Sequence, residues 1–491
     1  MFVGSYTTEV PFVKGGTNAK LGEGVVCFAL GFEGERLTLE RVELGGGLTA
    51  ADFGENPTYI AAGRMGAGLI VVNERYASAD GAAYPANGIR AFAVDRDADD
   101  AIALRALGAA AVDGIACCHC SVRAERGAIF AANYMSGSIC AFAIDRTTGG
   151  LGERTAWVQL PPVEGSAGDG RDVERQEGPH AHQTLVLPGF DGDGDAVAVP
   201  DLGGDVVRLY DVVPTADDPT QHTLAAEAVQ SLPLPKGSGP RHCVESPCAR
   251  WLYVVCELSS TVVVFPRLEE GLAAHSAARF DPAAAHAPVS TLPPRGSDGV
   301  GQSSAAESTT AAIRVHPSGE YVYVSNRGHD SIAVLAVDAR SGALTRVANV
   351  PTEGGAPRDF VLVTPRRRRG RHVRRPDGVR DVRDDAVVCR RHGAARERWL
   401  RPVPAPDDRR RALRPPIDSA RQRGARGERR RWAQPGLLGQ LLVEASPGRD
   451  GSKRHAGGVA QRDAARVRVL RRTALAAPPR RHGERDRLAP D

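Results

Sequence analysis

Histidine and arginine side chains recur at comparable positions in the first 364 residues of this 491-residue chain. Neutral imidazole can take a proton from water near pH 7, and arginine offers a planar fork of donors to an anion or a developing oxyanion. His180 and His182 stand two residues apart, a spacing that places both on one face of an extended strand. The candidates for one shared site are His119, His180, His182, Arg241, His242 and Arg358.

A repeated unit of short β-strands must position these side chains. In the clearest copy, the apolar strand Tyr321–Arg327 ends in polar residues, and the alternating segment Ser331–Asp338 follows after a turn. The corresponding polar positions of five copies are separated by 60, 68, 55 and 70 residues, and they are Asn73, Asn133, Asp201, Cys256 and Asn326. A period near 60 with at least three strands per unit predicts the blades of a β-propeller, and no helical periodicity of comparable length competes with it.

Each unit starts with a small or proline-containing step before its innermost strand, as in Gly178-Pro179-His180 and Gly239-Pro240-Arg241. The innermost strands of a propeller surround its centre, so residues at their ends meet there from different blades. The fold therefore predicts that the candidate histidines and arginines converge on one pocket.

The order and spacing of these strings resemble the seven-bladed β-propeller lactonase family, which includes propeller-type 6-phosphogluconolactonases and fungal carboxy-cis,cis-muconate lactonizing enzymes. The resemblance covers residues 1–364 and is carried by Phe2–Thr7, Pro179–His182, Gly239–His242, Ser325–Gly328 and Pro357–Phe360. It implies an all-β, seven-bladed propeller whose site needs neither a metal nor a cofactor. The implied catalytic residues are His180, His182, Arg241, Glu257 and Arg327, and His119, His242 and Arg358 are the expected substrate-binding residues.

The resemblance implies hydrolysis of an anionic sugar-acid lactone, with 6-phosphogluconolactone as the first substrate to test. A histidine would take a proton from water, one arginine would stabilise the oxyanion, and another would bind a phosphate or carboxylate. Two alternatives stay open: a muconate-type lactonizing enzyme, and a non-catalytic propeller that serves as a binding scaffold.

The composition and short motifs bear on where the protein is located and on whether it binds a metal. The chain contains no run of about 18 apolar residues, so no membrane span is predicted, and its first residues do not form a secretory signal. Nine scattered cysteines favour a reducing, cytoplasmic location. Neither of two metal-like strings predicts a metal site, because Asp191–Asp195 is followed by Ala196 where a calcium loop needs glycine, and Cys117–Cys120 lacks a second ligand pair.

The net charge of +4 conceals two unlike regions. Residues 365–491 hold 35 Arg, one Lys and 15 acids, a net charge of +21, which leaves −17 on residues 1–364. The tail has no Phe or Tyr and too few apolar residues to build a core. It is a disordered basic extension, a nucleic-acid-binding arm, or the product of a shifted reading frame. We favour the last, because Asp and Gly codons of GC-rich DNA read out of frame become Arg codons.

The break after Thr364-Pro365 falls inside the seventh blade. Three strands of that blade and the strand that closes the ring are expected to be missing, which would leave sheet edges open beside blades six and one. We therefore expect reduced stability or aggregation, to be tested by expressing residues 1–364 alone and measuring whether they melt cooperatively.

Overall fold

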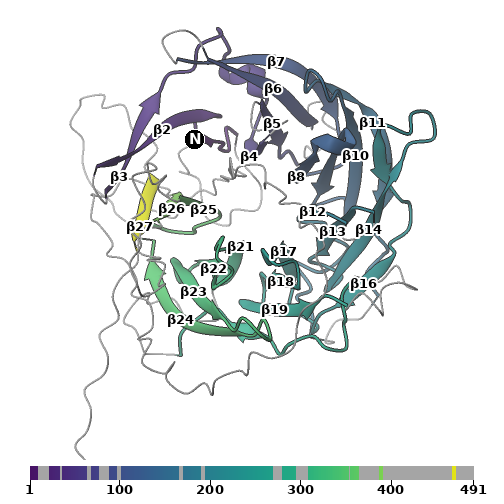
Figure 1. Cartoon of the computed structure of the whole chain (residues 1–491), viewed down its shortest axis with the longest axis vertical. Coiled ribbons are helices and arrows are strands. Elements are labelled where there is room, and N and C mark those ends of the chain that lie inside the picture. Colours follow the sequence, from purple (N-terminus) through teal and green to yellow (C-terminus); the bar gives the residue numbers. More distant parts are fainter. Residues whose placement is uncertain are drawn as a thin grey trace, which may run out of the picture.

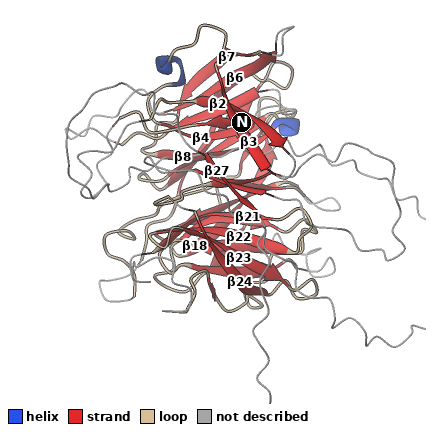
Figure 2. Ribbon diagram, turned by 90° about the vertical axis from the view of Figure 1, so that its left-hand side faces the viewer, coloured by secondary structure: helices blue, strands red, loops and turns tan. Residues whose placement is uncertain are grey.

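The computed structural model is a ring of small antiparallel sheets (Figure 1). It describes residues 1–8, 22–33, 36–62, 68–76, 88–96, 101–164, 170–189, 194–268, 279–294, 308–352 and 354–363, together with the backbone of 386–390 and 467–471. Seen from the side, the regular elements of the described chain are strands joined by loops (Figure 2), and its helices are the short 3-10 turns Ala50–Phe53 and Ala124–Arg126. Within the described residues, no helix is long and apolar enough to cross a membrane. The predicted all-β propeller is confirmed.

The sheets follow one another along the chain. The first contains β1 (Phe2–Val3), β2 (Val26–Glu33) and β3 (Arg36–Val42). The second contains β4 (Pro57–Ala62), β5 (Gly68–Asn73), β6 (Gly88–Arg96) and β7 (Ile102–Ala111). The third contains β8 (Cys117–Arg123), β9 (Ala128–Asn133), β10 (Ser138–Ile144) and β11 (Leu151–Gln159). The fourth contains β12 (Leu185–Leu187), β13 (Ala196–Asp201), β14 (Val206–Pro214), β15 (His222–Leu224) and β16 (Gln230–Pro233).

Three further sheets complete the circuit. The fifth contains β17 (Pro240–Glu245), β18 (Trp251–Cys256), β19 (Thr261–Pro266) and β20 (Val289–Ser290). The sixth contains β21 (Thr309–Val315), β22 (Tyr321–Arg327), β23 (Ser331–Val337) and β24 (Leu344–Pro351). The seventh contains β25 (Phe360–Val363), β26 (Ala386–Arg390) and β27 (Val467–Arg471). Strands β4, β8, β12, β17, β21 and β25 lie nearest the centre of the ring (Figure 1).

Three of the innermost strands, β4, β8 and β17, share an irregularity near their first residues. In β17, Pro240 pairs with Cys256 but His242 pairs with Val255, so Arg241 is an extra residue in the ladder. The same shift occurs after Pro57 in β4 and after Cys117 in β8. A bulge releases one residue from the alternation of a strand and re-aims its side chain. In these three blades the bulge therefore takes one side chain of the innermost strand out of the alternation.

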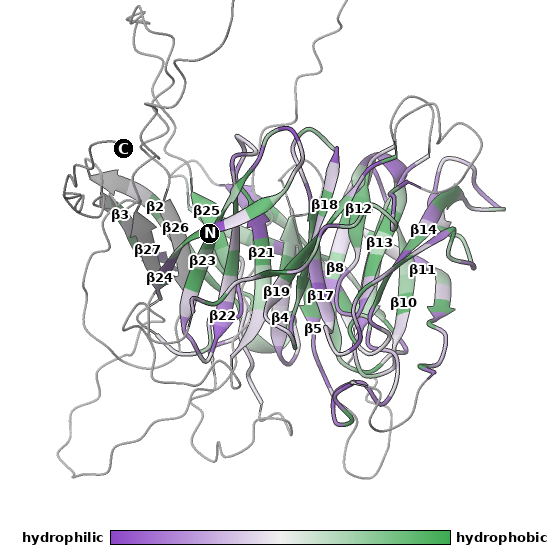
Figure 3. Ribbon diagram, turned by 90° about the horizontal axis from the view of Figure 1, so that it is seen from below, coloured by the Kyte–Doolittle hydropathy of each residue, from purple (hydrophilic) through white to green (hydrophobic). Residues whose placement is uncertain are grey.

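The core lies between neighbouring sheets, not within one of them. Alternating apolar residues on the strands of sheets two to six pack against the next sheet, as Phe142 does against sheet two and Phe265 against sheet four. Figure 3 shows hydrophobic colour along these strands and hydrophilic colour at many of the turns. This packing gives each of these sheets a buried face on both sides, and it fixes where the inner strand ends lie.

The contact between sheets seven and one is different. Among the described residues it is a small cluster in which Leu37 alone is fully buried, beside Val361 and Val363. The seventh sheet is not reduced to its innermost strand, because β26 and β27 from the tail pair with β25 and with each other. The predicted incompleteness of the last blade is confirmed, since its sheet has three described strands, but the expectation that three of its strands are missing is wrong.

Candidate active site

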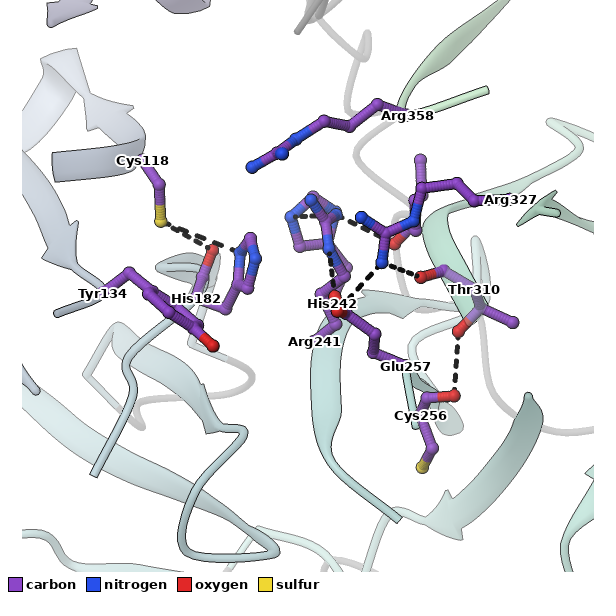
Figure 4. A network of polar contacts seen from close by, with 12 residues as sticks. Cys118, Tyr134, His182, Arg241, His242, Cys256, Glu257, Thr310, Arg327 and Arg358 are labelled. Atoms are coloured by element: carbon purple, nitrogen blue, oxygen red, sulfur yellow. Dashed lines mark hydrogen bonds and ion pairs between the residues drawn. The ribbon is translucent and has the colours of Figure 1, made fainter. Parts of the chain in front are cut away.

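Glu257 is the centre of a buried cluster of arginines (Figure 4). It directly follows β18, and its carboxylate lies 2.9 Å from Arg241 Nε, 2.9 Å from an Arg327 Nη and 2.8 Å from an Arg175 Nη. Arg241 is the bulge residue of β17, and Arg327 is the last residue of β22. Three separate elements therefore bring a cation to one carboxylate.

The charges of this cluster support one another. Burial alone would raise the pKa of Glu257, but Arg327, Arg175 and Arg241 outweigh it and hold that pKa well below its usual range. Glu257 is therefore an anion at neutral pH and cannot act as a proton donor. Burial lowers the pKa of Arg327 to about 10 despite the attraction of Glu257, and the neighbouring cations add to this effect. Arg327 nevertheless stays charged near pH 7, which leaves an excess of positive charge beside Glu257.

Three imidazole rings form a row beside the arginines. The centroid of His242 lies 5.5 Å from that of His182 and 5.4 Å from that of His119, and His242 Nε2 lies 3.2 Å from an Arg241 Nη. Burial, with the charge of Arg241 adding to it, lowers the pKa of all three histidines well below the usual value. Each ring is therefore neutral at pH 7 and can accept a proton at a nitrogen that carries none.

The two candidates of the Pro179–His182 string have different surroundings. His182 Nδ1 lies 3.7 Å from the Cys118 thiol, and its ring is next to His242 (Figure 4). His180 stacks on Tyr134, and its ring nitrogens contact the Tyr134 carbonyl oxygen at 3.0 Å and a Glu177 carboxylate oxygen at 3.1 Å.

The expectation that His180 and His182 lie on one strand face is wrong, because both precede β12 and the chain there makes only an isolated bridge between Ala181 and Asp201.

Arg358 approaches the same centre from the step before β25 (Figure 4). An Nη atom of Arg358 lies 3.6 Å from a carboxylate oxygen of Glu74. Glu74 also accepts hydrogen bonds of 2.6 Å from the hydroxyls of Tyr6 and Tyr76. A second buried glutamate thus directs a fourth arginine to the site.

All eight residues singled out in the sequence therefore lie in or beside this cluster, but His119 packs behind His242 against the ring of Tyr59. Sequence reasoning missed Arg175, Tyr134 and Glu74. Tyr134 and Glu74 directly follow Asn133 and Asn73, as Glu257 follows Cys256, so the repeat held a signal for both. Arg175 stands in a loop outside the repeat and had no such signal. Within the described ranges, no group of three His, Cys, Asp or Glu side chains is arranged to hold a metal ion.

Comparisons with known proteins agree with this architecture. The sequence model of the family described as lactonase, seven-bladed beta-propeller, matches residues 1–367. A 6-phosphogluconolactonase of Bacillus subtilis is 31% identical over 366 residues, which are 74% of this chain and 84% of that protein.

Solved structures show the same fold. A protein from Lactobacillus plantarum has a TM-score of 0.56 at 24% identity, over 79% of this chain and 88% of its own. A periplasmic gluconolactonase of Pseudomonas aeruginosa has a TM-score of 0.52 at 24% identity, over 73% and 85%. The ring of sheets, its central arginines and the match to residues 1–367 lead to one conclusion: the chain belongs to the seven-bladed β-propeller lactonase family.

Proposed function

We propose that this protein hydrolyses an anionic sugar-acid lactone, with 6-phosphogluconolactone as the substrate to test first. The observation that carries the proposal is the neutral His182 next to arginines that Glu257 holds in place. The Bacillus subtilis relative bears the name 6-phosphogluconolactonase, which supports the choice of substrate.

In the proposed reaction, His182 is the general base. Its Nδ1 faces the Cys118 thiol, so Nε2 is the nitrogen that takes a proton from the attacking water. The water oxygen forms a bond to the lactone carbonyl carbon, and the carbonyl oxygen becomes an oxyanion. The bond between this carbon and the ring oxygen then breaks, and the imidazolium returns the proton to the departing alkoxide. The product is an open-chain hydroxy acid.

The arginines are proposed to stabilise the charge that develops. Arg241 and Arg327 are oriented by Glu257 and by backbone carbonyls, since Arg241 donates to the Ala311 oxygen and Arg327 to the Thr310 oxygen, both at 3.0 Å. Donors that are already fixed need no rearrangement as the oxyanion forms. We assign substrate binding to Arg358 and His242, to His119 the support of the His242 ring, and to His180 the positioning of Tyr134.

The test is lactone hydrolysis by the wild type, His182→Ala and Arg241→Ala, with correction for spontaneous hydrolysis. Loss of a general base is expected to lower kcat by about 10²–10⁴-fold. Loss of an oxyanion donor should lower it by about 10²–10³-fold. His316→Ala is the matched control, because His316 is equally buried but binds Ser318 at the turn between β21 and β22. Undiminished rates in the two site variants would refute these assignments.

A further inference from the structure

Arg175 is the one arginine of the Glu257 cluster that lies outside the described strands. It lies in the loop between β11 and β12, and its Nη2 contacts the same Glu257 oxygen, Oε1, that Arg327 contacts. The same Nη2 also donates a hydrogen bond of 3.1 Å to the hydroxyl of Tyr134. Arg175 thus reaches the centre of the ring from outside the blades.

The three arginines differ in how firmly they are held. The side chain of Arg241 is 0% exposed and that of Arg327 is 17% exposed, and each also donates to a backbone carbonyl. The side chain of Arg175 is 38% exposed. Because water already reaches it, Arg175 loses less when it changes partner, and Glu257 keeps two arginines after Arg175 has left.

The backbone beneath Arg175 is fixed. The side chain of the next residue, Gln176, donates to Asp205 at 2.9 Å and to the Leu202 carbonyl at 2.8 Å. The carboxylate of Asp205 also accepts the backbone N–H groups of Gly237 and Gly239 at 2.8 Å, directly before β17. One carboxylate therefore holds both the loop that carries Arg175 and the start of the strand that carries Arg241. Only the side chain of Arg175 has to move.

The balance of charge indicates what Arg175 would move towards. Four guanidinium groups, those of Arg175, Arg241, Arg327 and Arg358, share the carboxylates of Glu257 and Glu74. These four cations and two anions leave two positive charges, which the two negative charges of a phosphate dianion would neutralise. A guanidinium fork binds two phosphate oxygens at once, which a neutral sugar hydroxyl cannot match.

We propose that Arg175 is a specificity-determining residue, whose guanidinium leaves Glu257 to bind the phosphate group of the lactone. The inference rests on the proposed lactonase function. It assigns to Arg175 the discrimination between a phosphorylated lactone and the same lactone without phosphate.

The test compares wild type and Arg175→Gln on 6-phosphogluconolactone and on unphosphorylated gluconolactone. The ratio of kcat/KM for the two substrates should fall about tenfold to hundredfold in the variant, mainly through KM for the phosphorylated substrate. Arg175→Lys keeps the charge without the fork, so its ratio should lie between the two. Arg154→Gln is the matched control, because Arg154 is 35% exposed and pairs with Asp113 at the outer strand β11. Its ratio should equal that of the wild type.

Binding of the hydrolysis products gives a readout that needs no turnover. Titration calorimetry should show that Arg175→Gln weakens binding of 6-phosphogluconate much more than binding of gluconate. Equal losses for both ligands, or no loss for either, would overturn the inference and leave Arg175 as a support for Glu257. A wild type that binds 6-phosphogluconate through Arg175 but hydrolyses neither lactone would refute the proposed function alone.

Discussion

Two buried glutamates occupy the same place in different blades: Glu74 directly follows β5, and Glu257 directly follows β18. Glu257 is surrounded by three arginines from sheets five and six and the loop before β12. Glu74 instead accepts hydrogen bonds from the neutral hydroxyls of Tyr6 and Tyr76, and among the described residues Arg358 alone forms an ion pair with it, at 3.6 Å. One register of the repeat has therefore acquired two different electrostatic environments.

This difference indicates separate roles for the two glutamates, one in the reaction and one in holding the sheets of the ring together. The Glu257 cluster lies beside well-packed sheets and gathers three arginines around one carboxylate. The Glu74 cluster joins residues next to β1, β5 and β25, and so connects sheets one, two and seven where few apolar side chains are buried. We infer that Glu257 mainly determines activity and that Glu74 mainly supports the ring.

The largest effect is expected from Glu257→Gln. The substitution removes the charge that balances buried arginines, so we expect a loss of about 3–5 kcal/mol in the free energy of unfolding. Because Arg241 and Arg327 lose their shared anchor, kcat/KM for the lactone should also fall by about 10²-fold or more. Denaturant unfolding and the lactonase assay measure the two losses. Glu245→Gln, on the same blade but paired with Arg267 away from the cluster, should lose much less of both.

A smaller and differently distributed effect is expected from Glu74→Gln. The amide keeps one acceptor oxygen but carries no negative charge. The hydrogen bonds from the hydroxyls of Tyr6 and Tyr76 therefore weaken, and the ion pair with Arg358 is lost. We expect a loss of about 1–3 kcal/mol in unfolding free energy. Because Arg358 loses its orientation, KM should rise more than kcat falls. A kcat loss as large as that of Glu257→Gln would contradict the separation of roles, and the exposed Glu55→Gln serves as control.

The smallest effect is the share of one buried histidine, His119, in the pH dependence of stability. Burial lowers the pKa of His119, His182 and His242, whereas in the unfolded chain they titrate near about 6.5. Below that pH the unfolded chain binds more protons than the folded one, so stability should fall as the pH decreases from about 6.5 to 5. Unfolding curves at several pH values measure this slope, and His119→Gln should reduce it. An unchanged slope in the variant would show that His119 is not neutral in the folded protein.

The fold could be predicted from the sequence because polar residues recur at the ends of its apolar strands. Asn73, Asn133 and Cys256 each end the second strand of a sheet, and Asn326 is the last residue but one of its strand. Each pairs with a residue at or next to the start of the innermost strand. That register was enough to bring Arg241, Glu257 and Arg327 together.

Other features depended on contacts that no spacing records. Arg175 reaches Glu257 because Asp205 holds its loop, and residues 171 and 205 are connected only in the folded chain. The pairing of β26 with β25 was missed because charged neighbours concealed a short apolar run, Ala386–Cys389, in the arginine-rich tail.

The bulge at the start of β4, β8 and β17 has an evolutionary consequence. It takes one position of the blade out of the alternation that assigns every other residue to the intersheet core, so the packing between sheets constrains the residue type less at that position than at its neighbours. Thr58, Cys118 and Arg241 already share it with unlike chemistry. Substitutions at these positions can therefore change the chemistry of the site while the strands around it keep their register.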